Sequence, residues 1–193
     1  GMALFNLDAV SVQVTVEDAV DGVVFDEARS LVSSVNVADY YDYCFAPIIR
    51  KTEARFENLP PYVNAEIRTR IFNEGSVAAC GNHVIGSLRT LGVTVQGAGF
   101  GIIDGSRKEA DDFENLDLVE RAYRSTASIE VIVNRMMIDE VKRVMTARRA
   151  KPTVFLGTDD FDATMIYGFP RNWTVVIDQY LRAVLTTDLE SLN

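Results

Sequence analysis

The side chains best suited to chemistry in this sequence are a cysteine and the only histidine, Cys80 and His83. A thiol and an imidazole can act together as nucleophile and base, and both can also bind zinc. Side chains three residues apart approach each other when they lie on a helix. Whether these two can work together therefore depends on the element that carries them.

The segment from about Glu66 to Asp104 predicts a helix around this pair. Apolar side chains recur there at intervals of three or four residues, at Val77, Cys80, Val84, Leu88, Leu91 and Val95. This spacing is typical of one face of a helix. Four glycines interrupt it, at Gly75, Gly81, Gly86 and Gly92. Since each glycine inside a helix costs about 1 kcal/mol relative to alanine, we expect another helix or a flat ligand to come close.

Catalysis and metal binding both lack supporting residues. A cysteine–histidine pair normally needs a third group that orients the base and an oxyanion hole, and the chain has no second histidine. Zinc binding by Cys44, Cys80 and His83 lacks the usual ligand spacing. Two cysteines predict no disulfide framework, and a small buried thiol is the alternative interpretation of each. The sequence therefore predicts neither an enzyme nor a metal site.

Most of the remaining chain also has a helical period. It extends from Phe25 to Phe56, where Pro47 should divide it, and recurs over Leu116–Tyr123, Ile129–Val144 and Trp173–Leu185. The basic cluster from Arg148 to Lys151, followed by Pro152, should end the third of these helices.

Two segments predict strands instead. Valines alternate strictly with polar residues from Ala9 to Glu17, and Thr153–Leu156 with Ala163–Tyr167 predicts a short hairpin. Over residues 92–104, Val93-Thr94-Val95 favours a strand and the following glycines favour a loop, so that both interpretations stay open.

Together these patterns predict a mainly α fold with small β pieces near 10–16 and 153–167. We expect one helical domain over 1–193, with an N-terminal arm at 2–24 and a core at 25–193. Gly1, which precedes Met2, is interpreted as an expression scar.

Charge and hydropathy limit the classes of partner. The formal net charge of −9 disfavours nucleic-acid binding, because phosphate contacts need clustered cations. Hydrophobic residues make up 48% of the chain, but no apolar run approaches the roughly 20 residues of a membrane span. With no cleavable leader evident, a cytoplasmic protein is expected.

One stretch resembles a known family. Ala78-Ala79-Cys80, followed after seven residues by Leu88-Arg89, resembles the chromophore-attachment segment of phycobiliproteins, the light-harvesting subunits of phycobilisomes. Leu116, Val119, Tyr123 and Ser125 resemble a later segment of that family. The resemblance implies a globin-like all-α fold and a linear tetrapyrrole, similar to phycocyanobilin, joined to Cys80 by a thioether.

Two positions depart from the family pattern. The family has an aspartate three residues after the cysteine and an arginine two residues after it, where this chain has His83 and Asn82. A neutral imidazole can accept one pyrrole N–H but cannot hold a cationic tetrapyrrole as a carboxylate does. The resemblance therefore implies a bilin site at Cys80 with Asn82, His83 and Arg89 as neighbours, in a divergent, non-enzymatic subunit.

The alternative function is a structural or interaction protein without a bilin. It would form homo-oligomers, or hetero-oligomers with another protein, in a phycobilisome-like or virion assembly. Its interface would draw on a supply of tyrosines that we expect to be exposed, Tyr40, Tyr41, Tyr43 and Tyr62.

Overall fold

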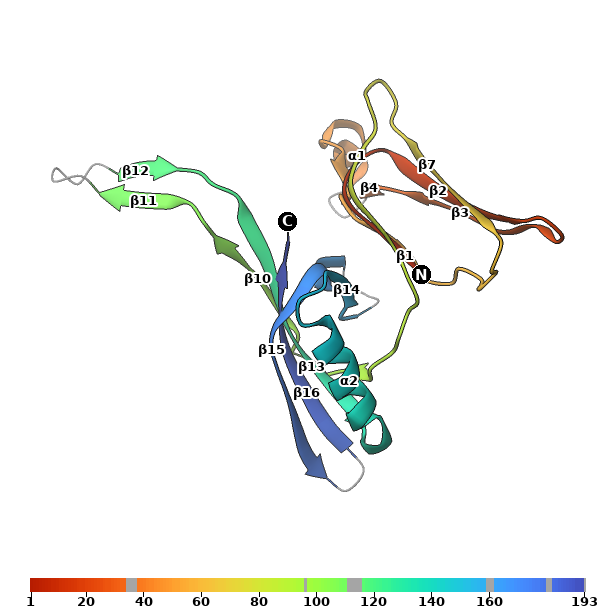
Figure 1. The fold of residues 1–193 in the computed structure, drawn as a ribbon. Helices are drawn as coiled ribbons and strands as arrows, with labels where there is room; N and C mark the ends of the chain where they lie inside the picture. The colour runs from red at the N-terminus through yellow and green to blue at the C-terminus, as the bar shows by residue number, and fades with distance from the viewer. Residues whose placement is uncertain (34–37, 96, 111–115, 159–161, 180–181, 193) are drawn as a thin grey trace. The chain divides into compact units, whose positions relative to one another are not determined.

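The chain forms two compact units, Gly1–Leu88 and Arg89–Asn193 (Figure 1). The computed structural model describes residues 1–33, 38–95, 97–110, 116–158, 162–179 and 182–192. One domain with its core at 25–193 was expected, and the boundary at Leu88 falls inside that range. Each unit has its own buried apolar residues and is described by itself.

The prediction of a mainly α, globin-like fold is wrong, because the described residues are mostly β-strand. Only α1 (Tyr40–Phe45) and α2 (Ile138–Arg148) are α-helices there. The first part of the helix predicted around Cys80 is instead two strands of different sheets, β7 (Glu66–Phe72) and β8 (Ala79–Ile85). Gly75, between these strands, has a φ of 79°, which belongs to a turn and not to a right-handed helix.

The first unit is built from short antiparallel strands. Besides β7 and β8 they are β1 (Met2–Asp8), β2 (Ser11–Asp18), β3 (Gly22–Ser30), β4 (Val32–Ser33), β5 (Ile49–Arg50) and β6 (Ala54–Phe56). One sheet has the order β6–β1–β8, a second has the order β3–β2–β7, and β4 pairs with β5. These are the sheets on which Cys80, Asn82 and His83 must be placed.

The core of the first unit lies between residues of both three-stranded sheets. Met2 and Leu4 of β1 belong to the same buried cluster as Val12 and Val14 of β2 and as Phe56. The strand predicted from alternating valines is confirmed, since Val12, Val14 and Val16 of β2 are buried and the residues between them only partly so. β2 could be predicted because polar and apolar residues alternate from Ser11 to Glu17.

The second unit is one curved antiparallel sheet with a helix. Its strands are β9 (Val93–Thr94), β10 (Gly99–Asp104), β11 (Arg107–Ala110), β12 (Leu116–Val119), β13 (Tyr123–Asn134), β14 (Thr153–Leu156), β15 (Met165–Gln179) and β16 (Arg182–Ser191). The sheet order is β10–β13–β16–β15–β14, β9 also pairs with β13, and β11 pairs with β12. Short 3-10 helices lie at Arg135–Met137 and Asp162–Thr164.

Helix α2 covers one face of this sheet. Val141 and Met145 of α2 pack against Val133 of β13 and Leu185 of β16, and all four are almost completely buried. The helix predicted from Ile129 to Val144 is therefore only half correct, because its first half is β13. Its predicted end is confirmed, since α2 stops at Arg148 within the basic cluster.

The last predicted helix is wrong as well. Trp173, Val176 and Ile177 lie on β15, and Val184 and Leu185 lie on β16, which pairs with it antiparallel. The hairpin predicted from Thr153 to Tyr167 is confirmed as β14 paired with the start of β15. At Gly168 a Cβ atom would overlap the carbonyl oxygen of Glu190, so that only glycine lets β15 and β16 come this close.

Candidate functional site

Cys80 and His83 lie on the same strand but point to opposite faces of its sheet. On β8, Cys80 is paired with Leu7 and His83 with Leu4 of β1. Side chains three apart share a face of a helix, whereas in a strand they alternate to opposite faces. The change from helix to strand therefore separates the two groups that the sequence suggested as nucleophile and base.

The environment of Cys80 does not favour a reactive thiolate. Its side chain is half-buried against the core of the first unit, with Sγ 3.5 Å from the carbonyl oxygen of Asn82 and 3.9 Å from that of Phe5. Burial raises the pKa of the Cys80 thiol, and hydrogen bonding with the backbone of Asn82 and Phe5 opposes this only in part. Reactive cysteines normally have a lowered pKa, so that this one is suited to packing.

The other three residues of the expected bilin site are divided between the two units. His83 lies with Nε2 2.9 Å from Sδ of Met2. Asn82 shares the face of Cys80 and is paired with Phe5. Arg89 belongs to the second unit, where its Nη1 lies 2.8 Å from Oε1 of Glu140.

Bilin attachment at Cys80 stays a prediction. The helix that was expected to hold the pigment is replaced by strand β8. The test of bilin attachment is co-expression with bilin synthesis, followed by a visible spectrum and a search for one added bilin mass on a Cys80 peptide. The globin-like scaffold that the resemblance implied is absent from the described residues.

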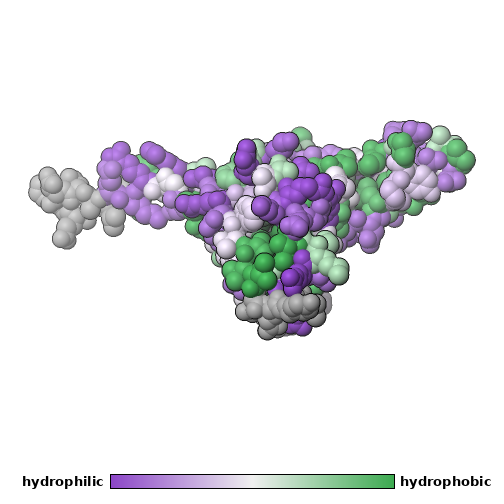
Figure 2. All heavy atoms as spheres, turned by 60° about the horizontal axis from the view of Figure 1, so that its bottom comes forward, coloured by the Kyte–Doolittle hydropathy of each residue, from purple (hydrophilic) through white to green (hydrophobic). Residues whose placement is uncertain are grey.

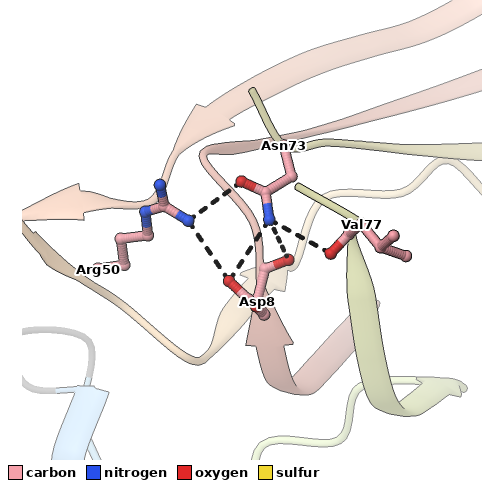
Figure 3. A network of polar contacts seen from close by, with 4 residues as sticks. All are labelled: Asp8, Arg50, Asn73 and Val77. Atoms are coloured by element: carbon pink, nitrogen blue, oxygen red, sulfur yellow. Dashed lines mark hydrogen bonds and ion pairs between the residues drawn. The ribbon is translucent and has the colours of Figure 1, made fainter. Parts of the chain in front are cut away.

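The polar network shown in Figure 3 fixes a loop of the first unit. Nη1 of Arg50 contacts Oδ1 of Asn73 at 3.1 Å and Oδ1 of Asp8 at 3.4 Å. Nδ2 of Asn73 donates to the carbonyl oxygens of Asp8 and Val77. The network joins the end of β1, β5 and the β7–β8 loop. Its groups are partly exposed, and their contacts hold these three segments together.

The described residues hold no group of three or more metal-ligating side chains of the kinds His, Cys, Asp and Glu. Neither α-helix in this part of the chain has the length and hydrophobicity needed to cross a bilayer. The described surface carries many exposed apolar side chains, among which three groups, at three places, stand out.

The first place is the aromatic helix, by which we mean α1 with its four ring side chains. Tyr40, Tyr41, Tyr43 and Phe45 are all at least 68% exposed, and no residue of α1 is buried. The expected exposure of the tyrosines is therefore confirmed. A six-residue helix that buries nothing has almost no stabilisation from its own packing.

The second place is the hairpin arm, which consists of β11 and β12 and continues from β10 and β13 (Figure 1). Leu118 is 66% and Val119 is 42% exposed, and the charged residues of β11 are exposed too. At the base of the arm the backbone N–H of Arg121 donates to Oγ of Ser106 at 3.1 Å. Asp104 bonds to the N–H of Ser106 and lies 2.7 Å from Nζ of Lys108.

The third place is the apolar row, formed by Val176, Val184, Ile132 and Val93 on four neighbouring strands. Each is paired directly with the next across the sheet. Successive side chains of a strand point to opposite faces of the sheet, and Val133 and Leu185 point to the face that α2 covers. The apolar row therefore lies on the other face. In Figure 1 the end of β15 and the start of β16 point downward. Figure 2 turns this end of the sheet toward the viewer and shows a group of hydrophobic side chains there.

The apolar row was not predicted, because Ile132, Val176 and Val184 were assigned to helices and Val93 was left open between strand and loop. The signal was present as consecutive β-branched residues, at Val131–Val133 and Val175–Ile177. A half-buried strand should alternate with polar residues, so apolar side chains at adjacent positions indicate a strand that is apolar on both faces.

No family model matches this chain, and a search of curated proteins finds no match either.

Proposed function

We propose that this chain is a structural subunit that associates with other copies of itself through exposed apolar β surfaces. The observation that carries the proposal is the hairpin arm, a two-stranded ladder whose described side chains are all exposed. An isolated hairpin is only marginally stable in water, and it becomes stable when it packs against another surface. A neighbouring copy supplies such a surface.

The aromatic helix supports the same function. Aromatic residues are enriched at protein interfaces, where they contribute a large contact area with few rotatable bonds. Here Tyr41 and Phe45 stack on each other, with ring centroids 4.8 Å apart, and both remain exposed. Contiguous exposed apolar groups of this kind mark interaction sites on soluble proteins.

The arm offers a direct test, because its two ends lie together at Ser106 and Arg121. Residues 107–120 can be replaced by Asn-Gly, which closes a tight hairpin between adjacent strands. We expect the full-length chain to sediment as an oligomer whose mass rises with concentration. The shortened chain should show a lower mass at the same concentration, with an unchanged far-UV signal per ordered residue.

A pair of single substitutions separates the arm from exposed apolar surface in general. Leu118→Asp alters the arm, whereas Val20→Asp alters the turn between β2 and β3, where Val20 is 89% exposed. Leu118→Asp should weaken association and Val20→Asp should not. A wild-type chain that stays monomeric at every concentration would refute the proposed function.

A further inference from the structure

The apolar row is a defined surface on the second unit. Neighbouring strands lie about 4.8 Å apart, so that four paired side chains cover roughly 14 Å across the sheet. Val93 is 73%, Val176 is 54% and Ile132 is 36% exposed. In water such a row is costly, and covering it stabilises whatever complex covers it.

The row is held firmly in place from below and from the side. Beneath it, Val133 and Leu185 pack against α2. At its edge, β9 is attached by a bond from the N–H of Val95 to the carbonyl oxygen of Glu130, 2.8 Å long, and by a bond from Oγ1 of Thr94 to Gly157. A surface fixed in this way loses little conformational entropy when a partner binds.

Charged residues of opposite sign lie on the two sides of the row. Two residues along the strands in one direction are Asn134 and Arg182, which are paired with each other. Two residues in the other direction are Glu130 and Thr186, also paired with each other, with Thr174 beyond them. Arg182 and Glu130 are both exposed, and neither forms an ion pair within the part of the chain that the structure describes.

This order of charges is complementary to itself. A two-fold axis parallel to the row turns a second copy over, so that row meets row and the strand directions are reversed. Arg182 then lies opposite Thr186 of the second copy. Glu130 of that copy is one strand away from Thr186, within reach of Arg182. Because of the two-fold symmetry, this Arg182–Glu130 contact occurs twice. A two-fold axis along the strands would instead bring like charges together, which disfavours that arrangement.

We propose that two copies of this chain pack face to face through the apolar row, with Arg182 of each copy paired with Glu130 of the other. Because this contact is one way for copies of the chain to associate, it rests on the proposed function. The row forms the dry centre of the contact, and the charged residues form its rim and fix its orientation.

The contact is tested by sedimentation of the full chain and of variants over a concentration series. Ile132→Glu should raise the dissociation constant of the dimer about tenfold or more, because it puts a charge at the dry centre. Met136→Glu is the matched control from the same unit, since Met136 is 95% exposed and lies outside the row, and it should leave the constant unchanged.

A charge exchange tests the orientation without altering the apolar residues. Arg182→Glu and Glu130→Arg should each weaken the dimer roughly threefold to tenfold at low salt, and the double variant should recover wild-type association. Recovery in the double variant supports the proposed pairing. Single variants that associate like wild type, or a double variant no better than either single one, would overturn it.

The outcomes also separate this contact from the proposed function. If the wild-type chain associates and Ile132→Glu, shown to be folded by circular dichroism, associates equally well, the contact is wrong while self-association stands. If the wild-type chain is monomeric throughout, both are wrong. If Ile132→Glu does not fold, association of the Arg182→Glu and Glu130→Arg variants and of the double variant decides whether the contact exists.

Discussion

Gly92 lies directly against the backbone of Ile132, so that no side chain can be accommodated at position 92. A Cβ atom there would overlap the carbonyl oxygen of Ile132 and lie 2.8 Å from Cγ1 of Val131. This contact brings β9 onto β13 and so places Val93 at the end of the apolar row. The glycine that looked like an interruption of a helix is therefore what permits this strand pairing.

We expect Gly92→Ala to destabilise the second unit by about 1–3 kcal/mol, because β9 must move away from β13 to make room. Gly99→Ala is the matched control from the same sheet, since a Cβ atom at Gly99 would have no neighbour within 4 Å. Urea unfolding followed by circular dichroism measures both variants. Equal unfolding midpoints for the two variants would show that Gly92 does not hold β9 in this position.

Two methionines, one on α2 and one just before it, give a second comparison. Met145 is 1% exposed and packs beneath the sheet, whereas Met136 is 95% exposed in the turn that precedes the helix. Met145→Ala should lower the free energy of unfolding by about 2–5 kcal/mol, because it leaves a cavity in the core. Met136→Ala should change it by less than about 0.5 kcal/mol. Similar losses in urea unfolding would contradict the described packing of α2.

Sequence patterns predicted the parts of the fold in which only one face of a strand is apolar. β2 alternates Val12, Val14 and Val16 with polar residues and was predicted correctly. β15 could not be predicted in the same way, because Trp173 and Val175 face α2 while Val176 belongs to the row on the other face. Apolar residues on both faces conceal the period of two, and the spacing that remains fits a helix by coincidence.

The expected grouping of site residues rested on the predicted helix. Cys80 and His83 were brought together only by the assumed helical period, and Arg89 only by the resemblance to a pigment-binding helix. Long-range strand pairing decided the structure here, since β8 is held by β1, more than seventy residues away in sequence. Such pairing leaves no local signal. Exposure of the tyrosines of α1, in contrast, was predicted from residue type alone.

The two cysteines should differ in reactivity. Cys44 is exposed on α1, whereas Cys80 is half-buried with a raised pKa. Since only the thiolate reacts, and burial limits both access and ionisation, native Cys44 should react with iodoacetamide roughly tenfold faster than Cys80 near neutral pH. Raising the pH should increase the rate at Cys80, because its thiol then ionises.

Peptide mass spectrometry of Cys44→Ser and Cys80→Ser, each with one thiol left, measures the two rates separately. In denaturant the rates should become equal, which controls for differences in the neighbouring sequence. Native Cys80 reacting as fast as Cys44 would show that Cys80 is not packed against the core of the first unit.

Asp104, at the base of the hairpin arm, should titrate below the ordinary range of an aspartate. The Lys108 ammonium group and the hydroxyl and N–H of Ser106 hydrogen-bond to its carboxylate and lower its pKa. A carboxylate with a lowered pKa stabilises the folded state above the unfolded-state pKa of about 3.9, and this contribution is lost as the pH falls through the folded-state pKa. NMR titration of the Asp104 carboxyl carbon measures this pKa directly.

Lys108→Met should raise the pKa of Asp104 toward its ordinary value, while Lys142→Met, on α2, should leave it unchanged. An Asp104 that titrates normally in the wild-type chain would mean that the Asp104–Ser106–Lys108 contacts do not form in solution.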